Sequence, residues 1–311
     1  MKFLIPSVLL FFFSSTTIFS QITDYQPFFA TAQPSGQKET LVVLRKWEQG
    51  GVEKMLVVHP TDLRTEVLPA NLLKVQPGTW QGIKNSLASS AYFKAMDGAY
   101  EHNLQLRQVA ETASNRHAKG IDLTVDLCAA SGPLSRAFFE TVLEKATAEE
   151  KPVKISVAVT GLWMIAHPAD LKWLVQQQKS NLMDITWINH SFHHHFPNDG
   201  SMPEDYIPGS GNENDVLQTE KMMLANGIVP SVYFNLPGRT SGPAAFEGAA
   251  DYGLIGVNTD HWLLPGDGSF VVSANGNERL KVGLFLETLR NNRAQIMPWQ
   301  WIYFDLSKTS K

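Results

Sequence analysis

Apolar runs divide the chain of 311 residues into two stretches with different rhythms. In the first stretch, apolar runs at residues 40–44 and 54–58 flank a Gln-Gly-Gly sequence, which predicts a β-hairpin. Residues 80–96 and 99–113 follow with apolar positions at helical spacing, so we expect two helices there. The pattern predicts a small α+β region of unknown role over residues 21–118.

From residue 119 onward, short apolar strands alternate with amphipathic helices. We expect the strands at residues 121–127, 153–159, 183–188, 229–234, 254–257, 270–272 and 299–304. Such alternation, with near-continuous apolar strands, indicates a parallel sheet. The predicted fold class is therefore α/β, a distorted (β/α)7-type barrel over residues 119–311. A doubly wound open sheet is the alternative, although no glycine-rich phosphate loop follows the first strand.

The first twenty residues have the pattern of a secretory signal peptide. Lys2 precedes an apolar run at residues 3–13, and small polar residues follow at 14–20. This run is too short to span a bilayer, and no later segment approaches ~18 uninterrupted apolar residues. We expect an exported protein, periplasmic or extracellular, with no transmembrane segment in the mature chain.

Composition adds two constraints. The chain is 43% hydrophobic and 18% charged, which is ordinary for a globular protein with a large core. Its formal net charge is −4 and it has no run rich in Lys and Arg, so nucleic acid is not expected as a partner. Cys128 is the single cysteine, so no internal disulfide can form and the folded state depends on its core.

Four of the nine histidines lie within six residues, directly after an apolar run at residues 185–188. His190 and His194 are spaced i and i+4. A helical turn would bring both imidazoles to one side, where they can hold one metal ion. For His193 and His195 we expect solvent exposure or local hydrogen bonds. A merely polar surface loop is the alternative for the whole cluster.

Polar and aromatic residues also follow the other predicted strands. These residues are Asp126, Asn235, Arg239, Asp260, His261, Trp262 and Ser273. In a barrel the carboxyl ends of the strands converge on one face. One carboxylate and two histidines there would form an open site that suits Zn²⁺ or another divalent cation. Trp163 and Trp262 are candidates for stacking on sugar rings, with core packing equally expected.

The order of these motifs resembles the polysaccharide deacetylase family, also known as the NodB-homology family or carbohydrate esterase family 4. The similar segments are 124–126 for the first motif (Thr-Phe-Asp-Asp), 190–194 for the second (His-Ser/Thr-x-x-His), 234–238 for the third (Arg-x-Pro), 260–262 for the fourth and the Ser273 region for the fifth. Asp-Leu-Cys at 126–128 and Asn-Gly-Asn-Glu at 275–278 are similar to a bacterial branch of the family. The resemblance covers residues from about 120 to 306.

The resemblance implies a hydrolase of carbohydrate metabolism that removes acetyl groups from an N- or O-acetylated polysaccharide or peptidoglycan-type glycan. It implies a divalent metal, with Zn²⁺ the expected ion. The resemblance implies His190 and His194 as metal ligands, and Asp126 at the position of the first Asp of the family, as base or metal ligand. Asp260 in the fourth motif is a further catalytic candidate, and so is His261 beside it, although the family pattern places no acid there. Asn235, Arg239 and Trp262 are the candidates for substrate binding.

Three positions depart from the family pattern. Leu127 stands where the family has a second Asp, normally a metal ligand. Asn235 stands where an Arg steadies the base, although Arg239 is close in sequence. Ser273 stands at the position of the acid His, and serine is a poor general acid near neutral pH. A catalytically impaired glycan-binding pseudoenzyme is therefore the alternative, and a different metal-dependent hydrolase, acting on a phosphate or peptide, is a third.

Overall fold

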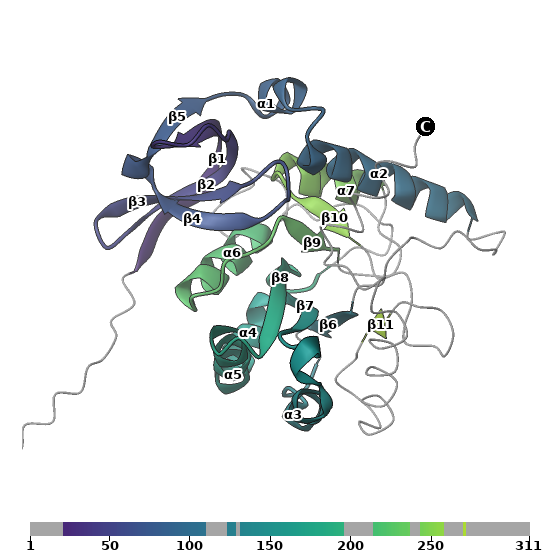
Figure 1. Ribbon diagram of the computed structural model, residues 1–311. Coiled ribbons are helices and arrows are strands. Elements are labelled where there is room, and N and C mark those ends of the chain that lie inside the picture. Colours follow the sequence, from purple (N-terminus) through teal and green to yellow (C-terminus); the bar gives the residue numbers. More distant parts are fainter. Residues whose placement is uncertain are drawn as a thin grey trace, which may run out of the picture.

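The computed structural model describes residues 21–109, 123–128, 131–195, 214–236, 243–257 and 270–271 (Figure 1). Several predicted features lie outside these ranges. They are the signal segment 1–20, the strand expected at 299–304, and Arg239, Asp260, His261, Trp262 and Ser273.

The N-terminal region contains a curved antiparallel sheet (Figure 1). Its strands are β1 Ile22–Pro34, β2 Leu41–Gln49, β3 Val52–Val58, β4 Thr65–Pro69 and β5 Leu73–Pro77, in the order β4-β3-β2-β1-β5, with a short 3-10 helix η1 at Ala70–Leu72. The predicted hairpin is confirmed, since β2 and β3 pair around Gly50 and Gly51. Both glycines have positive φ, 63° and 73°, which a two-residue hairpin turn of type I′ requires. Strands β1, β4 and β5 were not predicted, because their residues are mostly only partly buried and lack a continuous apolar run.

Two helices, α1 Trp80–Ser86 and α2 Ala91–Val109, follow this sheet. The expected helix over 80–96 is wrong in its boundary, because the chain turns at residues 87–90 and α2 begins earlier than predicted. Ser90 explains the break: its hydroxyl accepts a hydrogen bond from the backbone N–H of Phe93 (3.5 Å), as residues that start helices do.

The second sheet is parallel and has six strands in the part of the chain that the structure describes. They are β6 Leu123–Leu127, β7 Val153–Val159, β8 Met183–Asn189, β9 Tyr233–Asn235, β10 Ile255–Val257 and β11 Phe270–Val271. The helices between them are α3 Arg136–Lys145, η2 Ala148–Glu150, α4 Gly161–Ala166, α5 Pro168–Lys179, α6 Asp215–Ala225 and α7 Pro243–Asp251. The order β10-β9-β8-β7-β6-β11 follows the chain over five strands and sets β11 beside the first. This is consistent with the predicted distorted barrel.

The two faces of the parallel sheet have different partners. Side chains alternate along each strand. One face, which includes Val157 and Trp187, packs against helices α3 to α5. The opposite face, which includes Ala158 and Ile188, belongs to a buried cluster with Val42, Leu44, Val58, Tyr92 and Phe93. The N-terminal region therefore shares a core with the parallel sheet.

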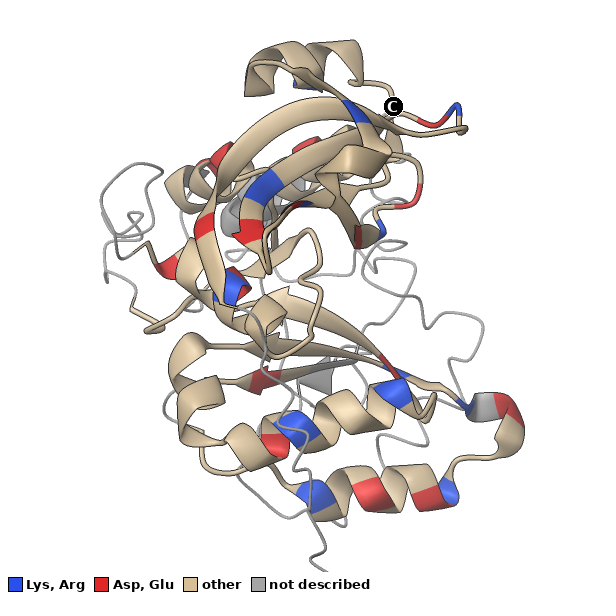
Figure 2. Cartoon of the chain, turned by 90° about the vertical axis from the view of Figure 1, so that its left-hand side faces the viewer, with Lys and Arg blue, Asp and Glu red and all other residues tan. Residues whose placement is uncertain are grey.

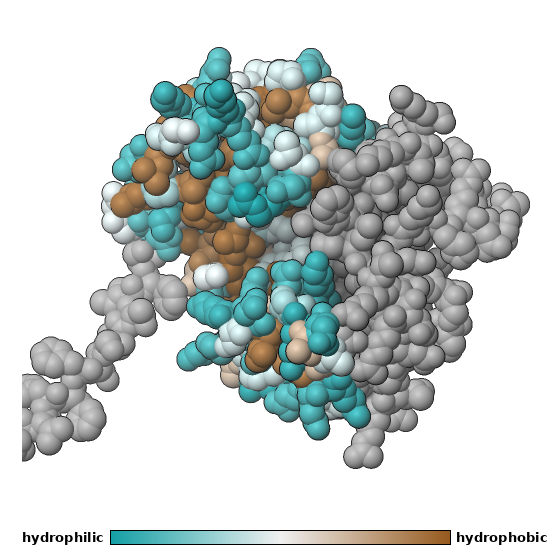
Figure 3. Space-filling model, viewed as in Figure 1, coloured by the Kyte–Doolittle hydropathy of each residue, from teal (hydrophilic) through white to brown (hydrophobic). Residues whose placement is uncertain are grey.

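The surface carries both signs of charge. Figure 2 shows acidic and basic residues interspersed along the described helices and strands. Figure 3 shows that, on the face seen there, hydrophobic surface gathers around the N-terminal sheet and α6, while the lower helices are mostly hydrophilic. None of the helices in the described ranges is both long enough and apolar enough to cross a bilayer.

Gly253 tests the packing between the N-terminal sheet and the turn before β10. Its φ is +73°, and a Cβ added there would come within 2.7 Å of Leu44 Cδ2. We expect Gly253→Ala to lower the free energy of unfolding by about 2–4 kcal/mol, from backbone strain plus overpacking. Gly51→Ala is the matched control, because Gly51 has the same φ with nothing within 4 Å. Equal losses for the two variants in urea denaturation would contradict close packing at Gly253.

Candidate functional site

The carboxyl ends of β6, β8 and β9 bring three predicted residues together. Asp126 pairs with Ala158, and Ala158 pairs with Ile188, so these three side chains lie on the same face of the sheet. His190 lies two residues after Ile188 and continues that face. Asn235 is the last residue of β9. The predicted convergence of strand ends is therefore present for Asp126, His190 and Asn235.

Asn235 contacts both of the other residues. Its backbone carbonyl accepts a hydrogen bond from His190 Nδ1 at 2.8 Å. Its side-chain Nδ2 donates to Asp126 Oδ1 at 3.0 Å. Because a carbonyl can only accept, the proton of neutral His190 resides on Nδ1 and leaves Nε2 unprotonated. That is the form in which an imidazole binds a metal.

His194 reaches His190 by a route other than the predicted helical turn. The segment 190–195, here named the histidine loop, is irregular, with Ser191 at φ +65° and His194 at φ +59°. The Ser191 hydroxyl accepts a hydrogen bond from the His194 backbone N–H at 2.9 Å. The two rings meet edge to face, with centroids 4.5 Å apart and planes at 70°. Proximity of the two imidazoles is thus confirmed, while the helical geometry is wrong.

Burial shifts the pKa values of all three ionisable groups toward their neutral forms. It raises the pKa of Asp126 to about 6, against the opposing effects of His194 and of the Asn235 hydrogen bond. It lowers the pKa of His190 to about 4 despite the bond to Asn235. Burial also lowers the pKa of His194 to about 4, with further lowering by His190 and opposition from Asp126. Near neutral pH, two neutral imidazoles therefore lie beside a carboxylate that is mostly ionised.

Asp215, which the sequence analysis missed, holds the histidine loop. Its buried carboxylate accepts hydrogen bonds from the backbone N–H groups of Phe192 (3.2 Å) and His193 (2.9 Å) and pairs with His193 Nδ1 (2.7 Å). The expected solvent exposure of His193 and His195 is confirmed, and the hydrogen bond of His193 is to a residue 22 positions away rather than to a local partner. The Asn-Asp pair that begins α6 was the available signal, because such residues start helices.

The burial of Leu127 and Trp163 decides two further expectations from the sequence. Leu127 is fully buried in the core against the helices, on the face opposite Asp126, so it takes no part in the site. Trp163 is fully buried as well, and its Nε1 donates to the Gly132 carbonyl at 3.2 Å. Of the two alternatives for Trp163, core packing is the one observed.

The donor chemistry of the site suits a divalent cation. Within the described ranges, no three His, Cys, Asp or Glu side chains come together as a ready-made metal site. The residues that fit are the adjacent imidazoles of His190 and His194, held neutral by burial, and the neighbouring Asp126 carboxylate. Neutral imidazole and carboxylate are ligands that Zn²⁺ accepts.

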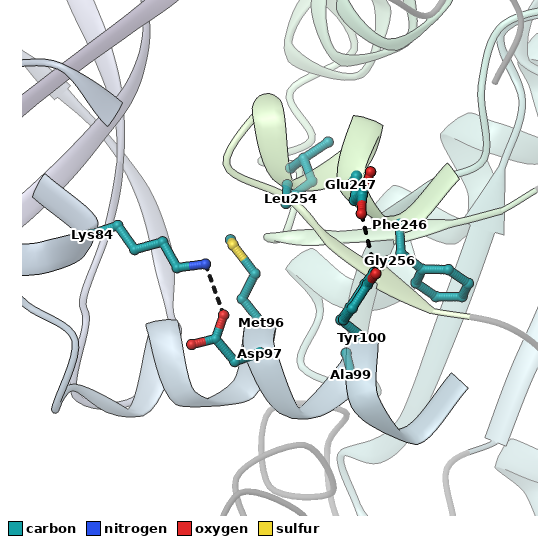
Figure 4. A pocket seen from close by; sticks show the side chains of 10 residues that line it. Lys84, Met96, Asp97, Ala99, Tyr100, Phe246, Glu247, Leu254 and Gly256 are labelled. Carbon is teal, nitrogen blue, oxygen red and sulfur yellow. Dashed lines mark hydrogen bonds and ion pairs between the residues drawn. The ribbon is translucent and has the colours of Figure 1, made fainter. Parts of the chain in front are cut away.

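A separate cavity of about 320 Å³ lies between α2 and the α7–β10 segment (Figure 4). Met96, Phe246 and Leu254 contribute apolar walls. Two interactions cross its lining: Lys84 Nζ pairs with Asp97 at 2.8 Å, and the Tyr100 hydroxyl donates to Glu247 at 3.1 Å. None of the predicted site residues that the structure describes lines this cavity.

No family model matches the chain. Among solved structures, it is similar to a family 4 carbohydrate esterase from Streptomyces lividans in complex with acetate, at 14% identity and a TM-score of 0.40, over 56% of this chain and 89% of that one. It is also similar to a pseudoenzyme of carbohydrate esterase family 4 from Bacillus anthracis, at 16% identity and a TM-score of 0.40, over 58% of this chain and 66% of that one. A mutant of a pseudoenzyme of this family with restored enzymatic activity matches at 15% identity and a TM-score of 0.39, over 58% of this chain and 69% of that one. All three structures are described as members of carbohydrate esterase family 4, which the sequence motifs resemble.

Stability of the metal-free protein should fall in acid because of His190. Its folded-state pKa of about 4 lies below its unfolded value of 6.5. Its stabilising contribution is therefore complete above pH 6.5 and is lost as the pH falls toward 4, by up to roughly 3 kcal/mol. Urea denaturation at several pH values should show a shallower fall over this window for His190→Asn. His195→Asn, at an exposed position, should keep the wild-type profile; a wild-type profile for both variants would contradict the burial effect.

Asp126 should act in the opposite direction. Its folded-state pKa of about 6 lies above the model-peptide value of 3.8, so its contribution is present below pH 3.8 and is lost as the pH rises through 6. We expect metal-free Asp126→Asn to be more stable than wild type by roughly 2–3 kcal/mol at pH 8 and equally stable near pH 3.5. Asp184→Asn, at an exposed position of β8, is the control. A gain that does not vary with pH would contradict this origin.

Proposed function

We propose that the chain is an exported, metal-dependent deacetylase-like hydrolase that acts on an N- or O-acetylated glycan. The observation that carries this proposal is the contact network of Asn235, whose carbonyl orients His190 while its side chain holds Asp126. This network brings a neutral imidazole and a carboxylate together at the strand ends, which supports the proposal. Export rests on the signal-like segment at residues 1–20.

His190 and His194 would hold the metal, with Asp126 beside them and Zn²⁺ as the proposed ion. A bound divalent cation supplies Lewis-acid polarisation of an acyl carbonyl and lowers the pKa of water. His190 is oriented for this by its Nδ1 bond, which directs the unprotonated Nε2 away from Asn235. His194 is held by the turn at Ser191.

Asp126 would also act as the general base. In the metal-free protein, burial raises the pKa of this carboxylate to about 6, so it is mostly ionised at neutral pH and able to accept a proton. Asn235 fixes Oδ1 with a neutral amide, which leaves Oδ2 as the atom to receive a proton. For the protonation of the leaving group, we propose His261 beside Asp260 as a substitute for the acid that Ser273 replaces, a role that the family pattern does not place there. We propose Arg239 and Trp262 for contacts with the glycan.

A glycan-binding pseudoenzyme is the second candidate. Leu127 favours it, because a fully buried apolar side chain stands where the family has its usual acidic metal ligand. Asn235 favours it also, since a neutral amide contacts the carboxylate where the family has an arginine. Both substitutions are compatible with glycan binding and reduce the number of charged groups available for chemistry.

Acetate release distinguishes the two candidates. Zinc-loaded protein should release acetate from at least one of three substrates, namely acetylated chitooligosaccharides, peptidoglycan fragments and acetylated xylan, and EDTA should abolish the release. Asp126→Asn should lower the rate by roughly 10²–10⁴-fold, because it removes the base. His190→Ala should lose both the bound metal and the activity, whereas His195→Ala should retain them. Glycan binding without any acetate release, beside a working control enzyme, would support the pseudoenzyme instead.

A further inference from the structure

A chain of buried contacts connects the N-terminal sheet to the histidine loop through helix α6. We propose that Arg45 and Glu220 are positioning residues for the metal-binding pair His190 and His194. They fix the place of α6, and α6 carries the groups that hold the loop. This inference rests on the proposed function for its metal-binding readout, and it gives the N-terminal region a role at the site.

The first link joins β2 to α6. Arg45 and Glu220 are both fully buried and form a bidentate pair, with Nε to Oε2 at 2.7 Å and Nη2 to Oε1 at 3.0 Å. The Tyr25 hydroxyl of β1 donates to the same Oε2 at 2.8 Å. A bidentate pair fixes direction as well as distance. Figure 1 shows α6 lying between the N-terminal sheet and β8, and it contacts both.

The second link runs from Arg45 to the start of α6 through Tyr252. Arg45 Nη1 donates to the Tyr252 carbonyl at 2.7 Å, and its guanidinium lies 5.6 Å from the centre of the Tyr252 ring. The Tyr252 hydroxyl hydrogen-bonds the side chain of Asn214. Asn214 in turn begins α6, because its Oδ1 accepts from the Leu217 backbone N–H at 3.1 Å. Arg45 therefore constrains both the middle and the first turn of the helix.

The third link joins the first turn of α6 to the histidine loop. The Asp215 carboxylate accepts hydrogen bonds from the backbone N–H groups of Phe192 and His193. The Asn189 side chain donates to the Val216 carbonyl at 2.9 Å and accepts from the Ser191 N–H at 2.9 Å. A displacement of this turn would therefore move the loop at residues 191–193.

The loop needs such support because two of its residues are strained. Ser191 and His194 occupy the left-handed region, where a residue other than glycine costs about 1–2 kcal/mol. Strained backbone persists only when surrounding contacts fix it. If α6 shifts, the loop can relax to ordinary dihedral angles, and the His194 ring then leaves its position beside His190.

The test compares full-length wild type with Arg45→Met, Glu220→Gln and the triple variant Tyr25→Phe/Arg45→Met/Glu220→Leu. The triple variant replaces the buried pair and its hydroxyl partner by apolar groups, an exchange that often preserves or raises stability. Zinc affinity is measured by competition with a chelating dye, and site geometry by the absorption bands of bound Co²⁺. We expect every folded variant to bind Zn²⁺ about tenfold or more weakly, with changed Co²⁺ bands. Val57→Ala, which removes buried volume from the N-terminal sheet away from α6, should lower stability without either change.

A metal-free arm separates this inference from the proposed function. Imidazole ¹H–¹⁵N spectra of EDTA-treated protein report the ring environments of His190 and His194. The signals should move in the three positioning variants and stay in place in Val57→Ala. If wild type binds no zinc but the signals move, the proposed metal function fails and the positioning role stands. If a folded variant keeps the wild-type spectra and zinc affinity, the positioning role is overturned.

Discussion

The buried pair of Arg45 and Glu220 is the interaction on which the arrangement of this protein depends. Burial acts to lower the pKa of Arg45, but the combined effects of Glu220, Tyr25 and Tyr92 raise it, so the guanidinium stays charged. A charged pair without solvent tolerates little displacement, because removing either partner leaves an uncompensated buried charge. The pair therefore fixes the position of helix α6 relative to the N-terminal sheet. The shared apolar core, which includes Val42, Leu44, Ala158 and Ile188, also stabilises this packing, but apolar contacts do not fix a direction.

The residues of the candidate site lower the stability of the folded protein, and the packing of the surrounding framework compensates for this cost. Asp126, His190 and His194 are all shifted toward their neutral forms by burial, which means that their charged forms are unfavourable in the folded protein. Two left-handed residues add backbone strain next to them. A cation bound between the imidazoles and the carboxylate would compensate the ionised Asp126. Groups that lower the stability of the free protein, and whose cost is offset when a ligand binds, are typical of functional sites.

The sequence predicted those features that follow from local pattern. The hairpin at Gly50 and Gly51, the alternation of strands and helices, and the convergence of Asp126 and His190 all rest on periodicity and strand direction. It did not predict the long strand β1, whose burial varies irregularly along its length. It also gave no hint of the Arg45–Glu220 pair, since residues 175 positions apart meet only through tertiary packing. The i and i+4 spacing of His190 and His194 correctly predicted that the two rings lie close together. The cause differs from the prediction, because left-handed residues at Ser191 and His194, rather than a helical turn, bring the rings together.

Of the two positions Leu127 and Asn235, only Asn235 touches the site, because Leu127 packs against the helices on the opposite face of the sheet from Asp126. With a single carboxylate remaining, an arginine at position 235 would favour its ionised form, lower its pKa and weaken it as a proton acceptor. The amide of Asn235 instead satisfies Oδ1 of Asp126 while leaving the pKa near 6. Its backbone carbonyl orients His190 in the same way whatever the side chain is. Asn235 therefore fixes both Asp126 and His190 without adding a charge to the site.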